Sequence, residues 1–182
     1  MRHRLAIART FGGAVLCAGA LALAVLAPAT PSFADDPVFR FRGREYMATG
    51  SNISHRLVWT SRLPFEGAYA DLTPQQVAYV RDQYDGLLPE EEPPYPADGL
   101  RAVFRLMDEE VDLLIAQTER GPLVAVAKVD ETGTVRSVSV YKSPNAAVTA
   151  AIAQALLKTE FKPARRQGKP VAMDFVVRAE LN

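Results

Sequence analysis

The chain has 182 residues with 21 basic and 21 acidic side chains, so its formal net charge is zero. A neutral chain has no global field to attract nucleic acid or an anionic membrane. Its composition, 48% hydrophobic and 23% charged, is that of a globular protein, while 13 prolines and 11 glycines indicate many turns and linkers. We therefore expect one compact domain together with a looser region.

Residues 1–34 have the form of a secretory signal peptide. Three arginines precede an uncharged apolar run over 11–27, and small residues with prolines lead to Ala34. This order of segments predicts export to the periplasm and cleavage after Ala34. Because the apolar run is at the lower length limit for a membrane span, the alternative is an uncleaved inner-membrane anchor.

The residue types that most often carry catalysis are scarce. The single cysteine, Cys17, lies in the apolar run, so a processed chain has no thiol for a disulfide, for catalysis or for a metal. His55 is then its only histidine, and no nucleophile elbow or phosphate-binding loop accompanies it. We expect no enzyme, no cofactor and no metal, and a periplasmic enzyme that uses His55 is the alternative.

Residues 35–92 are predicted to form a looser N-terminal region. Phenylalanines alternate with arginines over 39–44, which is typical of a short edge strand, but the glycine and polar residues that follow favour a weakly structured arm. Thr73 can cap a helix that has Pro74 in its first turn, and Gln76 completes a capping box. Three consecutive glutamates and four prolines over 87–98 predict a stiff, solvated linker.

The pattern after this linker is clearer. Apolar residues at helical spacing predict a helix over 100–118 with Asp98 as its cap, although the end of this segment is also compatible with a strand. A short apolar run, 123–129, enters the tight turn Asp130–Gly133 and predicts a strand. Its hairpin partner, 134–141, alternates imperfectly, which indicates a bulge near the turn.

Two further elements complete the chain. Ser143 and Pro144 start an alanine-rich helix that ends near Lys158, where a positive charge suits the helix dipole. Strict alternation over 171–181 then predicts a strand with one buried face.

The order of elements predicts an α+β fold: a small three-stranded antiparallel sheet packed with helices, preceded by a looser helical and extended N-terminal region. In this arrangement the last strand pairs antiparallel with the first and lies at an edge of the sheet. The expected organisation is a signal peptide over 1–34, an N-terminal region over 35–92 and a C-terminal domain over 93–182.

This C-terminal pattern resembles the C-terminal domain of the TonB energy-transducer family. The segment VAKVDETGTVRSVSVYKSP, an alanine-rich helix, FKPARRQGKPV and a terminal strand follow one another in the family's order. Pro94, Tyr95 and Pro96 resemble the usual entry into that domain, whereas Thr159 stands where an aromatic residue is common. The positions of the second motif that match are Phe161, Pro163, Ala164, Gly168, Pro170 and Val171.

The resemblance implies a periplasmic domain that binds an extended segment of an outer-membrane TonB-dependent transporter, or of another envelope protein, by strand addition. A sheet edge suits this mode because it offers unpaired backbone donors and acceptors. We expect no nucleic acid as a partner. A homodimer is compatible with the sequence. The candidate partner-binding residues are Arg165, Arg166, Lys169, Val171, Met173, Phe175, Val176, Val177 and Arg178.

The alternative that the resemblance leaves is an energy transducer anchored in the inner membrane, with motor proteins as further partners. It requires that the N-terminal apolar helix is retained. The proline-rich segment, 89–96, is far too short to cross a periplasm, because an extended chain covers at most about 3.6 Å per residue.

Overall fold

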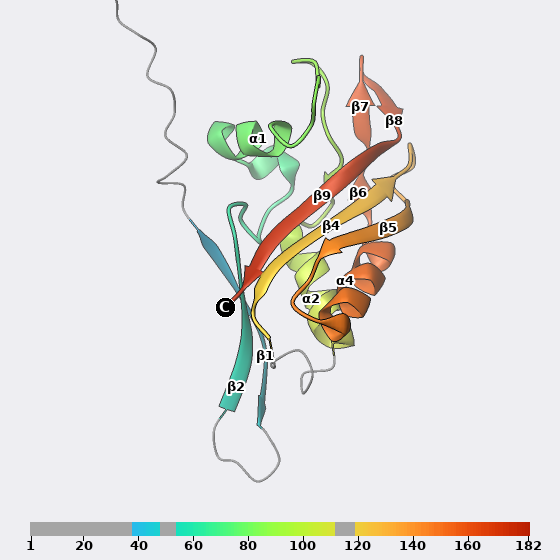
Figure 1. The fold of residues 1–182 in the computed structure, drawn as a ribbon. Coiled ribbons are helices and arrows are strands. Elements are labelled where there is room, and N and C mark those ends of the chain that lie inside the picture. Colours follow the sequence, from blue (N-terminus) through green and yellow to red (C-terminus); the bar gives the residue numbers. More distant parts are fainter. Residues whose placement is uncertain (1–37, 48–53, 112–118) are drawn as a thin grey trace, which may run out of the picture. The chain divides into compact units, whose positions relative to one another are not determined.

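The computed structural model describes residues 38–47, 54–111 and 119–182 (Figure 1). They belong to one compact unit, Asp35–Asn182, with a mixed α+β fold. The predicted signal peptide lies outside the described residues. None of the helices in the described ranges is long and apolar enough to span a membrane.

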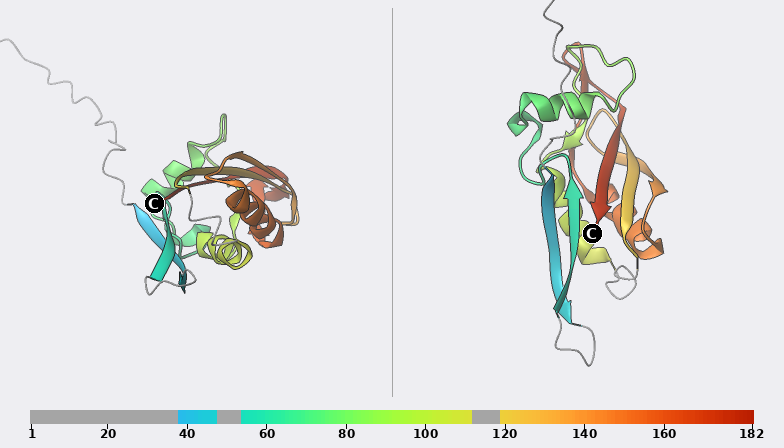
Figure 2. Two further views of the ribbon diagram at one scale, coloured as in Figure 1. Left: turned by 60° about the horizontal axis from the view of Figure 1, so that its bottom comes forward. Right: turned by 60° about the vertical axis from the view of Figure 1, so that its left-hand side comes forward.

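A five-stranded antiparallel sheet forms the centre of the fold, with the strand order β1-β2-β9-β4-β5. Its strands are β1 (Phe39–Met47), β2 (Ser54–Ser61), β4 (Gly121–Val129), β5 (Val135–Lys142) and β9 (Met173–Leu181). The helices are α1 (Pro74–Arg81), α2 (Leu100–Glu110), α4 (Ala146–Lys158) and the short 3-10 helix η2 (Tyr69–Asp71). Helices α2 and α4 lie side by side against one face of the sheet (Figure 2).

The strands β4 and β9 make the regular centre of this sheet. Their register runs without a shift from Gly121 opposite Leu181 to Val129 opposite Met173. Alternate residues of both strands are buried on the face toward the helices, including Leu123, Ala125, Ala127, Phe175 and Val177. The alternation predicted for 171–181 is therefore confirmed from Met173 on, since a strand with one buried face shows this period, whereas Val171 belongs to the separate strand β8 (Lys169–Val171).

The sheet has five strands instead of the predicted three, because β1 and β2, which pair antiparallel as a hairpin, add two strands. The prediction of a weakly structured arm over 39–44 is wrong. Phe41 is buried, and the centroid of its ring lies 5.6 Å from the ring centroid of Phe65 and 5.9 Å from that of Phe104 in α2. This aromatic cluster holds the hairpin against the helix layer, so the hairpin belongs to the same core.

The predicted linker is also packed into the fold. Tyr95 is completely buried, and its ring meets the Phe175 ring edge-on at 5.8 Å. Strand β3 (Tyr95–Pro96) pairs with β6 (Phe161–Lys162), so the proline-rich segment runs beside the segment that precedes the last strand. The prediction of a solvated linker is therefore wrong for its second half: Glu91, Pro93, Pro94 and Pro96 are buried, whereas Pro89 and Glu90 are exposed.

The helix starts agree with the predictions only in part, since Ser143 and Pro144, for example, precede α4 and do not cap it. The Thr73 and Gln76 capping box of α1 is confirmed. Helix α2 begins after Gly99 without a side-chain cap, so the prediction of Asp98 as its cap is wrong. Helix α4 is capped by Asn145, which accepts a hydrogen bond from Val148 N at 3.1 Å. The bulge predicted near the turn is present as a register shift between β4 and β5.

Candidate functional site

The open edges of the sheet differ in regularity. Strand β1 has a register shift against β2, between Arg42 and Glu45, and β5 has two shifts against β4. Bulges of this kind bend an edge strand and hinder the pairing of a further strand. Strand β9 is regular, and it pairs with β2 only at Glu180 and Leu181. The prediction that the last strand is an edge strand is therefore wrong at its C-terminal end, while its preceding part pairs with no described strand on that side.

Hydrogen bonds at the end of β9 show to which side of the strand its backbone N–H and C=O groups point. Asn182 N donates to a β2 carbonyl at 3.0 Å, and the Ser61 hydroxyl donates to the Arg178 carbonyl at 3.2 Å. Backbone groups of alternate residues in an antiparallel strand point to the same side. Asp174 and Val176 therefore direct their N–H and C=O groups toward the same open side, where no strand in the part of the chain that the structure describes pairs with them. We call residues 174–178 the open edge of β9.

Tyr84, in the segment after α1, lies beside this open edge. Burial raises the pKa of its hydroxyl, and the charge of Asp174 raises it further, while the Val176 amide acts in the opposite direction. The hydroxyl oxygen is buried and makes no hydrogen bond of ordinary geometry within the described residues. Tyr84 thus covers the edge without completing its hydrogen bonding.

A cavity of about 560 Å³ opens next to this edge, on the sheet face that α2 and α4 leave free. Val124, Val126 and Val176 line it from β4 and β9, and Tyr84 and Arg166 are among its other lining residues. A second hollow of about 330 Å³ shares Val124 and Arg178 with the first. We call the two hollows together the outer groove.

The structure divides the predicted partner-binding residues into three groups. Arg166, Met173, Val176 and Arg178 all line the cavity. Phe175 and Val177 are buried in the core on the opposite face, so their side chains are not exposed to a partner. The hairpin formed by β7 (Ala164–Arg166) and β8 (Lys169–Val171) carries Arg165, Lys169 and Val171, which do not line the cavity.

Glu91 fixes one side of the cavity, and the sequence pattern did not single it out. Its side chain is only 4% exposed; one carboxylate oxygen pairs with Arg166 Nε, and the other accepts from Leu88 N at 3.2 Å. Arg81 of α1 donates to the carbonyls of both Glu91 and Leu88. The run of three glutamates predicts solvated charge. Only the packing shows that Glu91, its middle residue, connects α1 to the β7–β8 hairpin through Arg81 and Arg166.

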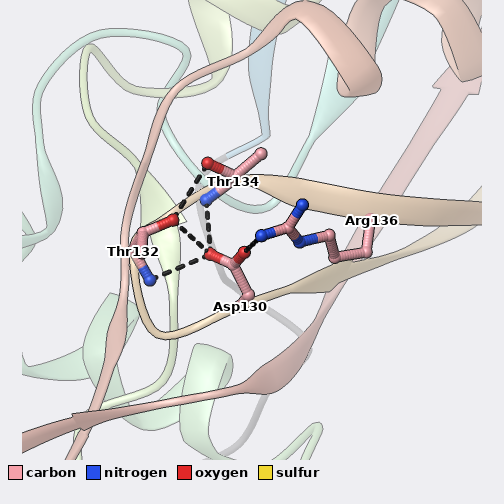
Figure 3. A network of polar contacts seen from close by, with 4 residues as sticks. All are labelled: Asp130, Thr132, Thr134 and Arg136. Atoms are coloured by element: carbon pink, nitrogen blue, oxygen red, sulfur yellow. Dashed lines mark hydrogen bonds and ion pairs between the residues drawn. The ribbon is translucent and has the colours of Figure 1, made fainter.

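The turn Asp130–Gly133 is built as a structural unit (Figure 3). Asp130 Oδ1 accepts from Thr132 Oγ1 at 2.6 Å, Thr132 N at 2.9 Å and Thr134 N at 3.0 Å, while Oδ2 pairs with Arg136 at 2.5 Å. The Thr132 hydroxyl, with help from the two amides and Arg136, lowers the pKa of Asp130 to about 2. Because Phe161 N donates to Gly133 O at 3.1 Å, the turn also holds the segment that leads to β9.

Catalytic and metal-binding groups offer no comparable site in the described ranges. There, no group of three or more histidine, cysteine or acidic side chains is placed to hold a metal ion. The backbone of His55 lies in β2 opposite Tyr46, and its side chain lies outside the described parts of the chain.

No protein family, curated protein or solved structure matches this chain. The likeness to the TonB C-terminal domain therefore rests on the sequence pattern alone.

Proposed function

We propose that this chain is a periplasmic TonB-like protein that binds an extended segment of an outer-membrane TonB-dependent transporter, or of another envelope protein. The segment adds as a strand to the open edge of β9. One observation carries the proposal: β9 is regular over its whole length, yet beyond its two pairs with β2 no strand among the described residues pairs with it on that side. Strand addition needs backbone groups and no catalytic residue, which suits this site.

The strength of such binding has two physical sources. Backbone hydrogen bonds at Asp174 and Val176 contribute about 0.5–1.5 kcal/mol each, which is too little for a stable complex without further contacts. Apolar side chains of the incoming strand can bury the exposed parts of Val124, Val126 and Val176 in the outer groove. The incoming strand displaces Tyr84 from the edge, and a carbonyl of that strand replaces the Tyr84 hydroxyl as the group next to the Val176 amide.

Val176→Pro tests the proposal. The Val176 amide faces the open edge and not β4, so a proline removes no hydrogen bond of the sheet, but it removes a donor that the added strand needs. We expect isotopically labelled wild-type chain to show amide shifts over 174–178 on titration with transporter-derived peptides. Val176→Pro should bind at least about tenfold more weakly, the equivalent of one lost hydrogen bond and local strain.

His55→Ala is the control for the enzyme alternative and should leave peptide binding unchanged. Wild-type amides at 174–178 that stay in place with every peptide would rule out strand addition at β9. Shifts confined to β1 or β5 would move the docking site to another edge and would equally contradict the proposal.

A further inference from the structure

Arg178 is a cation in the middle of the outer groove. It lies on the sheet face away from α2 and α4, directly opposite Val124, and it lines both hollows. Gln83 accepts a hydrogen bond from Arg178 Nε at 3.2 Å. Within the described residues no carboxylate forms an ion pair with this guanidinium, so its two amino groups have no anionic partner.

The neighbours of Arg178 indicate which kind of ligand its guanidinium suits. Val124 faces it across the strands, and Val176 precedes it by two residues on the same face. Glu180 follows it by two residues but forms no ion pair with it, and Glu91 is already paired with Arg166. Asp85 and Asp174 also line the cavity, but within the described residues neither forms an ion pair with Arg178. An exposed arginine beside two valines and without an ion pair is complementary to an anionic group, and its planar fork matches a carboxylate.

We propose that Arg178 binds the carboxylate of an acidic side chain in the partner's extended segment, with apolar side chains of the same segment on Val124 and Val176. The inference rests on the proposed function, because a strand added to β9 places every second side chain over this face of the sheet. It goes further by naming the partner chemistry: an acidic residue with apolar residues two positions away on either side.

Gln83 is a positioning residue in this scheme. Its side-chain oxygen holds Arg178 Nε, and its side-chain nitrogen donates to the Tyr79 carbonyl at 3.4 Å. The amide therefore links α1 to β9 and orients the guanidinium over the groove. Gln83→Ala should reduce the preference for a carboxylate while leaving the binding of an uncharged peptide nearly unchanged.

Three blocked heptapeptides test the proposal. Each has valine two residues on either side of a central position that is glutamate, glutamine or lysine, and polar residues elsewhere. Affinities are measured by calorimetry on the whole chain, with amide shifts recorded in parallel. We expect wild type to bind the glutamate peptide about tenfold to a hundredfold more tightly than the glutamine peptide, as for a hydrogen-bonded charge pair.

Arg178→Gln should abolish this preference, and Arg178→Lys should keep only part of it because the fork is lost. The matched control is Arg165→Gln, which removes an exposed arginine that does not line the groove and should leave the preference intact. Equal affinity of wild type for the glutamate and glutamine peptides overturns the proposal. A glutamate peptide that does not bind also overturns it. An equal loss of preference in Arg178→Gln and Arg165→Gln overturns it as well, because the preference would then come from unspecific attraction between charges.

Val176→Pro separates this inference from the proposed function. If the glutamate preference depends on Arg178 but Val176→Pro binds all three peptides as wild type does, the carboxylate site stands and strand addition is wrong. If Val176→Pro weakens all three peptides and wild type shows no glutamate preference, strand addition stands and the role of Arg178 is wrong.

Discussion

Trp59 of β2 lies opposite Leu181 of β9, and neither side chain is more than 1% exposed. This pair closes the C-terminal end of the last strand with a strand from the same chain. It also buries Trp59 against Phe104, with ring centroids 5.5 Å apart, so the hairpin is part of the core. The strand addition that we propose therefore has only the preceding part of β9 available, beside α1 and the outer groove.

The Asp130 turn predicts a pH-dependent contribution to stability. The folded pKa of Asp130, about 2, lies below its ordinary value of 3.8. A lowered pKa means that the stabilisation is complete above about pH 4 and disappears as the pH falls from 3.8 toward 2. Urea unfolding of wild type and Asp130→Asn should differ at pH 6 and converge near pH 2. A difference that is constant with pH would show that the charge of Asp130 is not involved.

Adding a single methyl group at Gly133 should lower the unfolding free energy strongly. Its φ is +87°, and a Cβ atom there would lie 2.0 Å from the Phe161 carbonyl oxygen. Gly86 has a similar φ, +73°, with nothing within 4 Å, so it is a matched control. Gly86→Ala should cost about 1–2 kcal/mol of unfolding free energy for the backbone conformation alone. Gly133→Ala should cost about 1–3 kcal/mol more for the clash, measured by urea denaturation. Equal losses would contradict the close packing of the turn on β6.

The contacts of Glu91 predict that this glutamate contributes to stability, while its neighbour Glu90 does not. Glu91→Gln removes the charge that pairs with Arg166 and weakens the acceptor for Leu88 N, so we expect a loss of about 1–2 kcal/mol in unfolding free energy. Glu90 is exposed, and Glu90→Gln should stay within about 0.5 kcal/mol of wild type. Thermal unfolding of both variants measures the difference, and similar melting temperatures would contradict the role of Glu91.

The N-terminus decides between the two membrane hypotheses. The order of charged, apolar and small residues over 1–34 predicts a mature chain that begins at Asp35. Mass spectrometry of the protein isolated from its native envelope measures this directly. A chain that begins at Met1 in the inner membrane would instead favour the anchored energy transducer.

Part of the fold was predictable because its signals are local. The capping box of α1 lies within four consecutive residues, the Asp130 turn within five, and the alternation of β9 within one strand. Such features depend on the backbone and side chains of near neighbours, so a sequence pattern is enough to predict them. Arg166, Met173, Val176 and Arg178 line one cavity, and their role in binding a partner stays a prediction.

The sequence by itself thus determined which segments become the helix α4, the hairpin β4–β5 and the last strand, since periodicity and turn residues specify them. Only the tertiary structure decided what lies beside that last strand. Trp59 meets Leu181, Tyr84 approaches Val176, and Glu91 pairs with Arg166 across long stretches of chain. Each of these contacts depends on how distant elements pack, and strand pairing is set by that packing more than by local preference. The packing therefore left one regular strand partly open and placed Arg178, which forms no ion pair with a described residue, in the groove beside it.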